Sequence, residues 1–349
     1  MLKLTFLGTS AGVPTKQRNV TGLGVSLINP YSTTKDTPWL LIDCGEGTQH
    51  QILHTPLSLQ QLRAICITHV HGDHCYGLAG LLASMSMNGR KQPLTLIAPQ
   101  AIGNLLDSLT LHTELYFNFN IDFISLESLS LTNQRFKAVD LSLSDSHQLT
   151  IEPFALSHRV ASHAFKICQT LHTVQLDTAK LQAMGVPPSA VWGKLQHGYD
   201  VTLEDGRTLL AKDLTEAISP TTAIIVAGDN DTPSLLREAC QGVSLLVHEA
   251  TYTQAIADKI AQRGDGFDPQ HSSAKQVASF AQSVGLPNLI LTHFSGRFQP
   301  FDKPSHTTLN MGHLREEVGS FYQGKFWLAN DFDEFEVQQT RVKRKTTNR

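Results

Sequence analysis

Short runs of apolar residues alternate along most of the chain with longer stretches whose apolar residues recur about every three to four positions. The short runs predict strands, and the longer stretches predict helices. Strands are expected over Leu2–Leu7, Trp39–Ile42, Ala64–Ile67, Leu94–Ala98, Ala223–Ala227, Ser244–Val247 and Asn288–Leu291. Helices are expected over Tyr76–Met87, Pro99–Leu109, Pro233–Cys240, Ser272–Val284 and His306–Val318. This alternation indicates an α/β protein in which helices cover the sheets.

One stretch, Leu171–Tyr199, breaks the alternation. It contains Pro187-Pro188 and several glycines but no clear buried strand. We interpret it as an inserted arm and a candidate exosite within a single domain of residues 1–349; a loop without a role is the alternative. After it, Asp205-Gly206 lies between Val-Thr-Leu-Glu and Arg-Thr-Leu-Leu, which predicts a hairpin.

Composition limits the class of protein. Of the 349 residues 41% are hydrophobic and 17% are charged, so the chain can form a large core and lacks the marks of disorder. The net charge of -3 gives no overall basic surface for nucleic acid, so RNA binding would depend on local patches or bound metal. The basic segment 341–349 is one such patch, although a solvated tail is the simpler interpretation.

Cysteine usage and the N-terminus indicate the compartment. The five cysteines are an odd number without a C-x-x-C pair, which predicts reduced thiols rather than a disulfide framework. The N-terminus lacks the features of a signal peptide, and no apolar run reaches the roughly 18 residues of a membrane span. We therefore expect a cytoplasmic protein.

The segment Thr68-His69-Val70-His71-Gly72-Asp73-His74 places three imidazoles and one carboxylate directly after an expected strand. Burying so many polar groups side by side would leave some without partners, whereas a metal ion accepts them all. Because no thiolate lies in the cluster, its ligands favour zinc, with manganese or iron as second choices. The sequence therefore predicts a metal site here.

The motif H-x-H-x-D-H in this segment resembles the signature of the metallo-β-lactamase superfamily, which implies an αββα sandwich that holds two zinc ions. The resemblance implies that His69 and His71 bind the first ion, and that Asp73 and His74 bind the second. Three later residues stand in contexts similar to those of the ribonuclease Z family, which implies further ligands: His158, a bridging Asp229 and His293.

Two further segments are similar to ribonuclease Z, namely Phe6–Asn19 and Val247-His248-Glu249-Ala250-Thr251. The resemblance implies that His248 protonates the leaving 3′-oxygen and that Glu249 orients His248. His271, in His271-Ser272-Ser273, would support His248 or merely begin the following helix.

The same resemblance implies roles for residues around the centre. Asp73 would orient or deprotonate the attacking water. Asp43 would steady a metal ligand, with a helix N-cap as the alternative. Lys16, Arg18 and Arg297 would hold phosphates near the cleaved bond, with exposed solubilising charge as their alternative.

The resemblance to ribonuclease Z covers nearly the whole chain. It implies a homodimeric, zinc-dependent endoribonuclease that cleaves the 3′ trailer from precursor tRNA, leaving a 3′-hydroxyl on the tRNA and a 5′-phosphate on the trailer. The sequence departs from the family's pattern in two places: Asn230 replaces a threonine after the bridging aspartate, and Ser189-Ala190 replaces a Gly-Pro pair. Two alternatives stay open. One is another hydrolase of this fold acting on a small phosphodiester, lactone or thioester, and the other is a catalytically silent RNA-binding relative.

Overall fold

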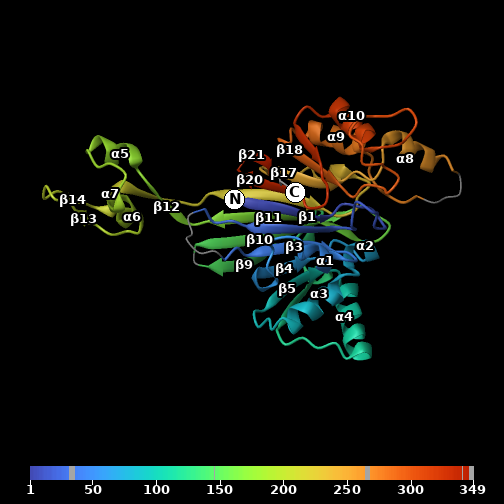
Figure 1. Ribbon diagram of the computed structural model, residues 1–349, viewed down its shortest axis with the longest axis horizontal. Helices are drawn as coiled ribbons and strands as arrows, with labels where there is room; N and C mark the ends of the chain where they lie inside the picture. The colour runs from blue at the N-terminus through green and yellow to red at the C-terminus, as the bar shows by residue number, and fades with distance from the viewer. Residues whose placement is uncertain (31–35, 145, 264–267, 340, 346–349) are drawn as a thin grey trace. The chain divides into compact units, whose positions relative to one another are not determined.

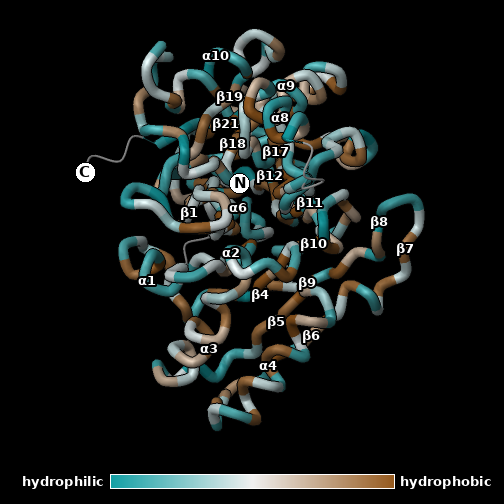
Figure 2. The backbone as a smooth tube through the Cα atoms, turned by 90° about the vertical axis from the view of Figure 1, so that its right-hand side faces the viewer, coloured by the Kyte–Doolittle hydropathy of each residue, from teal (hydrophilic) through white to brown (hydrophobic). Residues whose placement is uncertain are grey.

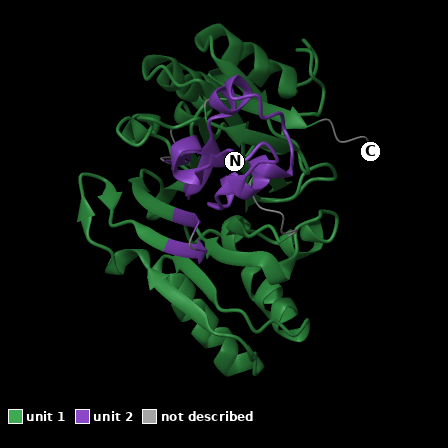
Figure 3. Cartoon of the chain, turned by 90° about the vertical axis from the view of Figure 1, so that its left-hand side faces the viewer, with its two compact units in different colours: residues 1–140, 150–168, 222–349 green, residues 141–149, 169–221 purple. Residues whose placement is uncertain are grey.

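The computed structural model describes residues 1–30, 36–144, 146–263, 268–339 and 341–345. The chain divides into two compact units, which Figure 3 shows in different colours. The core unit comprises residues 1–140, 150–168 and 222–349, and the small unit comprises residues 141–149 and 169–221. Every residue expected to bind metal belongs to the core unit.

The first sheet of the core unit contains β1 (Leu2–Gly8), β2 (Gly22–Leu27), β3 (Trp39–Cys44), β4 (Leu62–Cys66), β5 (Leu94–Ala98), β6 (Ile121–Ser125), β20 (Glu334–Gln338) and β21 (Arg341–Lys345). Their order is β21-β20-β1-β2-β3-β4-β5-β6. Every residue of β2 and β3 is buried, so both faces of the sheet are covered there. Helices α1 (Thr48–Ile52), α3 (Leu78–Met87) and α4 (Gln100–Thr113) lie beside this sheet (Figure 1), and Leu81 of α3 packs in one cluster with Leu41 and Ile65.

The second sheet contains β7 (Leu131–Thr132), β8 (Arg135–Phe136), β9 (Val139–Ser144), β10 (His147–Leu156), β11 (Ser162–Leu171), β16 (Thr221–Ala227), β17 (Leu245–Glu249), β18 (Asn288–Thr292) and β19 (Lys325–Leu328). Their order is β19-β18-β17-β16-β11-β10-β8-β7, and β9 pairs with β10. Helices α8 (Gln254–Ala261), α9 (Ala274–Ser283) and α10 (Met311–Phe321) lie near β17 and β18 (Figure 1), where Val277 and Leu314 pack in one cluster with Leu246 and Leu289. Figure 2 shows that hydrophobic residues run along β4 and β5 of the first sheet. The expected α/β architecture, with helices covering the sheets, is confirmed.

All seven expected strands are present, with ends within two residues of the expected ones. Three expected helices differ. The helix expected over Pro99–Leu109 continues to Thr113. Pro233–Cys240 contains only a short 3-10 helix, Pro233–Leu236, because the chain then turns through Gly242 at φ 70° to enter β17. Helix α10 begins at Met311 instead of His306, because the Asn310 side chain caps it by accepting from the Gly312 N–H at 3.0 Å. The strands β10 and β11 were not expected.

The small unit contains the residues of the expected arm. Its elements are β12 (Thr173–Leu176), α5 (Thr178–Ala183), α6 (Ala190–Gln196), β13 (Val201–Thr202), β14 (Thr208–Leu209), α7 (Ala211–Leu214) and β15 (Thr215–Ile218). Strand β12 pairs antiparallel with β15, so the excursion runs to Ile218 rather than to Tyr199. The expected hairpin at Asp205-Gly206 joins β13 to β14, with Gly206 at φ 85°. Leu181 and Leu195 belong to an apolar cluster within this unit.

Much of the basic C-terminal segment is a strand and not a solvated tail. Strand β21 pairs antiparallel with β20, its Val342 is buried, and Arg344 forms an ion pair with Asp333 at 2.6 Å. The rest of the segment, residues 346–349, lies outside the described residues. Within the described ranges, no helix has the length and apolar character needed to cross a membrane. All five cysteines are free thiols, as expected.

Candidate metal centre and active site

A loop and a one-turn helix after β4 carry the first histidine cluster. His69 and His71 lie in the loop, and α2 (Gly72–Cys75) carries Asp73 and His74. His69 and His74 are buried, whereas His71 and Asp73 are partly exposed. The ring centroids of His69 and His74 are 4.0 Å apart, so the loop and the helix direct their side chains into the same space.

The three later ligand candidates reach this space from the ends of other strands. His158 follows β10, Asp229 follows β16 and His293 follows β18. Ligand atoms within 4.8 Å of one another place these residues in two groups: His69, His71, His158 and Asp229, and Asp73, His74 and His293. A third group joins Asp229 and His293 to His271. The structure thus brings all seven predicted ligands together.

Asp229 lies between the two groups. Its Oδ2 is 3.6 Å from His69 Nε2 and 3.7 Å from His158 Nε2. Its Oδ1 is 3.4 Å from His74 Nε2 and 3.3 Å from His293 Nε2. Burial favours the neutral acid, but the charges of His293, His74 and His69 outweigh it and hold the pKa of Asp229 well below its usual value. One carboxylate oxygen therefore faces each group, as expected for a bridging ligand.

Hydrogen bonds on the outer side of the imidazoles fix which nitrogen carries the proton. His158 Nδ1 donates to the Gln270 carbonyl oxygen at 2.8 Å, and His74 Nδ1 donates to Asp43 Oδ2 at 2.7 Å. In a neutral imidazole Nε2 then carries a lone pair. Asp43 therefore orients His74, while the N-cap of the next helix is Gly47.

Two threonines orient two more ligands. Thr68 Oγ1 donates to Asp43 and so accepts from His69 Nδ1 at 2.9 Å. Thr251 Oγ1 donates to Glu249 and so accepts from His293 Nδ1 at 3.0 Å. Both histidines therefore also present an Nε2 lone pair to the centre.

Lone pairs consequently face one another across the centre. His74 Nε2 is 3.3 Å from His293 Nε2. The Nδ1 of each ring already carries a proton, which it donates to Asp43 in the case of His74 and to Thr251 in the case of His293. Lone pairs at this separation repel one another unless a cation lies beside them. Without a metal ion that cation is a proton on His74: burial lowers the pKa of His74, but the charges of Asp229 and Asp43 outweigh it and raise the pKa well above its usual value. A metal ion would take the place of that proton. Neutral imidazole is the commonest metal ligand in proteins. The donor set therefore fits a metal centre built from imidazole and carboxylate ligands.

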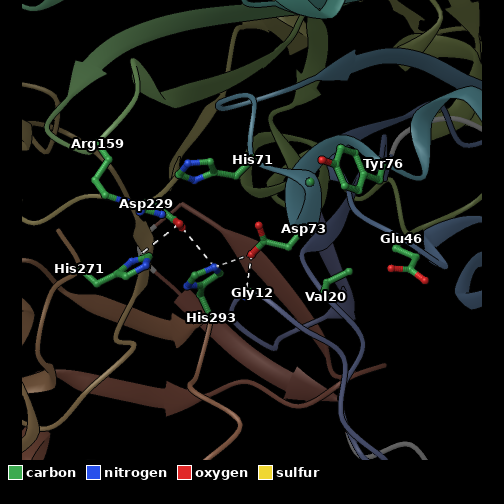
Figure 4. Close-up of a pocket in the computed structure, with 11 residues that line it drawn as sticks. Gly12, Val20, Glu46, His71, Asp73, Tyr76, Arg159, Asp229, His271 and His293 are labelled. Atoms are coloured by element: carbon green, nitrogen blue, oxygen red, sulfur yellow. Dashed lines mark hydrogen bonds and ion pairs between the residues drawn. The ribbon is translucent and has the colours of Figure 1, made fainter. Parts of the chain in front are cut away.

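A cavity of about 350 Å³ opens onto the centre. Figure 4 shows the residues that face it from the centre: His71, Asp73, Asp229, His271 and His293. Glu46, Tyr76 and Arg159 also line the cavity, and the Tyr76 side chain is 70% exposed. A substrate that enters this cavity therefore meets both metal-ligand groups and His271.

The N-terminal loop orients Asp73. The backbone N–H of Gly12 donates to Asp73 Oδ2 at 2.8 Å (Figure 4). The loop is itself attached beside His293, because Ala11 N donates to the Phe294 carbonyl oxygen and Phe294 N donates to that of Thr9.

His248 does not reach the cavity. Its side chain is fully buried, its Nδ1 donates to the Glu249 carbonyl oxygen at 2.8 Å, and its Nε2 accepts from Asn230 Nδ2 at 3.0 Å. Burial lowers the pKa of His248, which agrees with the neutral imidazole that this pattern requires. Both ring nitrogens are used within the protein, so the prediction that His248 protonates the leaving group is wrong.

His271 faces the cavity instead. Its Nδ1 is 3.0 Å from Oε1 of the buried Glu249 and 3.7 Å from Asp229 Oδ2. Burial lowers the pKa of His271, but the charge of Glu249 and the hydrogen bond to it prevail and raise the pKa to about 9. Glu249 thus orients His271 rather than His248. The following helix begins only at Ala274, so His271 does more than start it.

Comparison with known proteins gives the family. Ribonuclease Z of Marinobacter nauticus is 46% identical over 340 residues, which cover 97% of this chain and 97% of that protein. The chain belongs to the ribonuclease Z family. Residues 2–179 also match the family model described as Anti-Pycsar protein Apyc1, and the chain belongs to that family through this half.

Solved structures show the fold that this ribonuclease Z family member shares. The short form of human tRNase Z matches with a TM-score of 0.60 at 23% identity, covering 96% of this chain and 99% of that one. A metallo-β-lactamase fold protein of Bacillus subtilis matches with a TM-score of 0.57 at 16% identity, covering 99% of both chains. The expected metallo-β-lactamase fold is confirmed.

The three residues expected to hold phosphates lie in different surroundings in this ribonuclease Z family member: one is buried and two are exposed. Arg18 is 8% exposed and donates to Thr9 Oγ1 at 2.5 Å and to the Ala329 carbonyl oxygen at 2.8 Å, so its prediction as a phosphate ligand is wrong. Its guanidinium ties the N-terminal loop to the chain before β20. Lys16 and Arg297 are exposed but do not line the cavity, and their contact with phosphate stays a prediction.

Sequence reasoning missed residues that orient ligands without binding metal. Thr68 and Thr251 fix two histidine tautomers, and Gly12 holds Asp73 through its backbone. Thr251 lies in the segment that resembles ribonuclease Z, and Thr68 directly precedes the H-x-H-x-D-H motif, so their positions were a usable signal. The contact of Gly12 comes from its backbone N–H, for which the side-chain pattern contains no signal.

Proposed function

We propose that this chain is a zinc-dependent endoribonuclease that removes the 3′ trailer from tRNA precursors. The proposal is carried by one observation: a chain that matches ribonuclease Z over almost its full length has every expected ligand gathered at one centre, which a cavity reaches. Family membership alone indicates a nuclease, and the converging lone pairs indicate that the centre is intact. An intact centre argues against a catalytically silent relative.

Two zinc ions would be held by the two ligand groups, which share Asp229. Imidazole and carboxylate ligands without thiolate favour zinc. When bound, paired ions lower the pKa of a water and polarise the phosphoryl oxygen for in-line attack. The two aspartates return two of the four positive charges, so the filled centre keeps a positive charge suited to a phosphodiester.

The chain's own residues would move the protons. Asp73 lies at the cavity with Oδ2 fixed by Gly12, where it orients the attacking water and accepts its proton. His271, held by Glu249, donates a proton to the 3′-oxygen as the bond between phosphorus and that oxygen breaks. The tRNA then keeps a 3′-hydroxyl, and the trailer keeps the 5′-phosphate.

RNA would be held beyond the cavity by local groups, because the net charge of the chain is -3. Arg159 lines the cavity, and Lys16 and Arg297 are exposed. The small unit, which includes Lys180 and Lys194, is the candidate exosite for the tRNA body. A homodimer and a cytoplasmic location also belong to this proposal; the free cysteines agree with a reducing compartment.

A product-mapping experiment tests the proposal. The zinc-loaded protein is incubated with one 3′-extended precursor tRNA, with the mature tRNA and with bis(4-nitrophenyl) phosphate, each with and without chelator. We expect a single cut in the precursor, a 5′-phosphate on the trailer and loss of activity with chelator. Hydrolysis of the small phosphodiester without any cleavage of the precursor would favour the alternative of a small-substrate hydrolase.

A further inference from the structure

Asn230 is fully buried and uses all of its polar groups. Its backbone N–H donates to Glu249 Oε1 at 2.8 Å, and its carbonyl oxygen accepts from Ser272 Oγ at 2.5 Å. Its side-chain Oδ1 accepts from the Thr232 N–H at 3.1 Å, and its Nδ2 contacts His248 Nε2 at 3.0 Å. One residue thus joins the loop of the bridging aspartate to the end of β17 and to the segment of His271.

Two of these contacts close a ring together with one hydrogen bond of His248. Asn230 N donates to the Glu249 carboxylate, Asn230 Nδ2 donates to His248 Nε2, and His248 Nδ1 donates to the Glu249 carbonyl oxygen. The backbone register between β16 and β17 ends at Val226 and Val247. The ring therefore connects the two segments beyond the point where their strand pairing ends.

The direction of every bond in the ring is fixed. Asn230 Oδ1 faces the backbone N–H groups of Thr232 and Ser157, which only donate, so Nδ2 must face His248. His248 Nδ1 faces a carbonyl oxygen, which only accepts, so Nδ1 carries the proton and Nε2 the lone pair. Donor meets acceptor at each contact, and a change of either partner would change this pattern.

The ring ends at the carboxylate that orients His271. Glu249 Oε1 accepts from Asn230 N and from His271 Nδ1, and Glu249 Oε2 accepts from Thr251. We propose that Asn230 is a positioning residue that, through its ring with His248, holds the Glu249 carboxylate against His271 and so orients the imidazole at the cavity. The inference rests on the proposed function, in which His271 protonates the leaving oxygen.

Two substitutions change the ring in different ways. Asn230→Asp keeps the size and Oδ1 of the side chain but replaces the donor by a carboxylate, so His248 Nε2 must take up a proton, and the direction and charge of this contact are reversed. Asn230→Ala removes the side chain and keeps the backbone N–H. Asp231→Asn, at the next position, is the matched control, since its carboxylate accepts from Thr232 and takes no part in the ring.

We expect both Asn230 variants to lower kcat on precursor tRNA by about 10–100-fold, with KM and zinc content unchanged. Hydrolysis of bis(4-nitrophenyl) phosphate should change little, because 4-nitrophenolate leaves without a proton. The double variant Asn230→Ala/His248→Ala should be no slower than the slower single variant, because both changes break the same ring. The control should behave as the wild type.

Nitrogen NMR of the zinc-loaded protein gives a readout independent of activity. His248 should be protonated at Nδ1 and unprotonated at Nε2 in the wild type, and Asn230→Asp should change the Nε2 signal. Wild-type kcat on precursor tRNA in both variants, or equal loss on both substrates, would overturn the inference. If the wild type does not cut precursor tRNA, the proposed function fails, and a His248 protonated at Nε2 would still refute the ring.

Discussion

Replacing His271 by alanine is the sharpest test of how the leaving oxygen is protonated. The change removes the imidazole that lines the cavity and leaves the buried Glu249 without one of its donors. General acid–base groups contribute roughly 10²–10⁴-fold, or about 2.7–5.4 kcal/mol at about 1.36 kcal/mol per tenfold. Glu249 is 1% exposed and is also held by Asn230 and Thr251, so His271 is well oriented before substrate binds. We therefore expect the upper half of the range, about 10³–10⁴-fold.

The assay compares two leaving groups under single-turnover conditions. Cleavage of a 3′-extended precursor tRNA releases an alkoxide that needs a proton, whereas bis(4-nitrophenyl) phosphate releases a stable phenolate. His271→Ala should slow the first reaction by the stated factor and the second only slightly. His248→Ala is the comparison variant, and it should lose about 10–100-fold on precursor tRNA, because it affects His271 only through Glu249.

The zinc content of the His271→Ala protein distinguishes two explanations for a loss of its activity. His271 also has a ligand atom within 4.8 Å of those of Asp229 and His293, so it could hold metal instead of donating a proton. A His271→Ala protein that keeps full zinc content yet loses both reactions equally would refute the role as proton donor. So would wild-type cleavage of precursor tRNA by this variant.

Three further predictions concern the metals, the small unit and the N-terminal loop. Asp229→Ala should reduce both metals in elemental analysis, whereas His158→Ala should mainly reduce one; full occupancy in the Asp229 variant would exclude the bridge. Replacing residues 174–217 with a short Gly-Ser linker, which joins the paired Thr173 and Ile218, should abolish precursor cleavage and spare bis(4-nitrophenyl) phosphate hydrolysis. Cleavage of the precursor at the wild-type rate would remove the small unit from RNA binding. Arg18→Ala should lower thermal stability, because it leaves the buried carbonyl oxygen of Ala329 without its hydrogen-bond donor, which costs about 1–3 kcal/mol of folding free energy. The KM for precursor tRNA should stay unchanged. A raised KM without destabilisation would restore Arg18 as a phosphate ligand.

Most of the ligands stand where the sequence predicts the end of a strand, whereas His158 follows the unexpected β10 and was predicted only from the resemblance to ribonuclease Z. Asp229 and His293 come directly after buried parallel strands, whose carboxyl ends lie at one edge of the sheet. The segment after β4 gives a second signal, because three histidines and one aspartate lie within six residues there. Residue type and position after a strand therefore point to the same residues, and this prediction does not depend on how side chains pack.

Arg18 and the C-terminal segment show what the pattern does not contain. Arg18 stands in an exposed-looking polar run, but its guanidinium is enclosed by Thr9, Ala329 and Asn330, two of which lie more than 300 positions later in the chain. Strand β21 likewise depends on β20, which supplies its backbone partners. Charged residues are typical of edge strands because they discourage pairing with other chains, so composition alone resembles a solvated tail.

The exchange of roles between His248 and His271 follows from the geometry of β17. Successive side chains of a strand point to opposite faces, so His248 and Glu249 cannot both face the centre. Leu246, on the same face as His248, packs in the cluster with α9 and α10, and Glu249 on the other face reaches Asn230, Thr251 and His271. Once Glu249 is assigned to the centre, the alternation directs His248 away from it. In the proposed mechanism the proton donor then comes from a different segment, and His271 is the histidine that Glu249 contacts there.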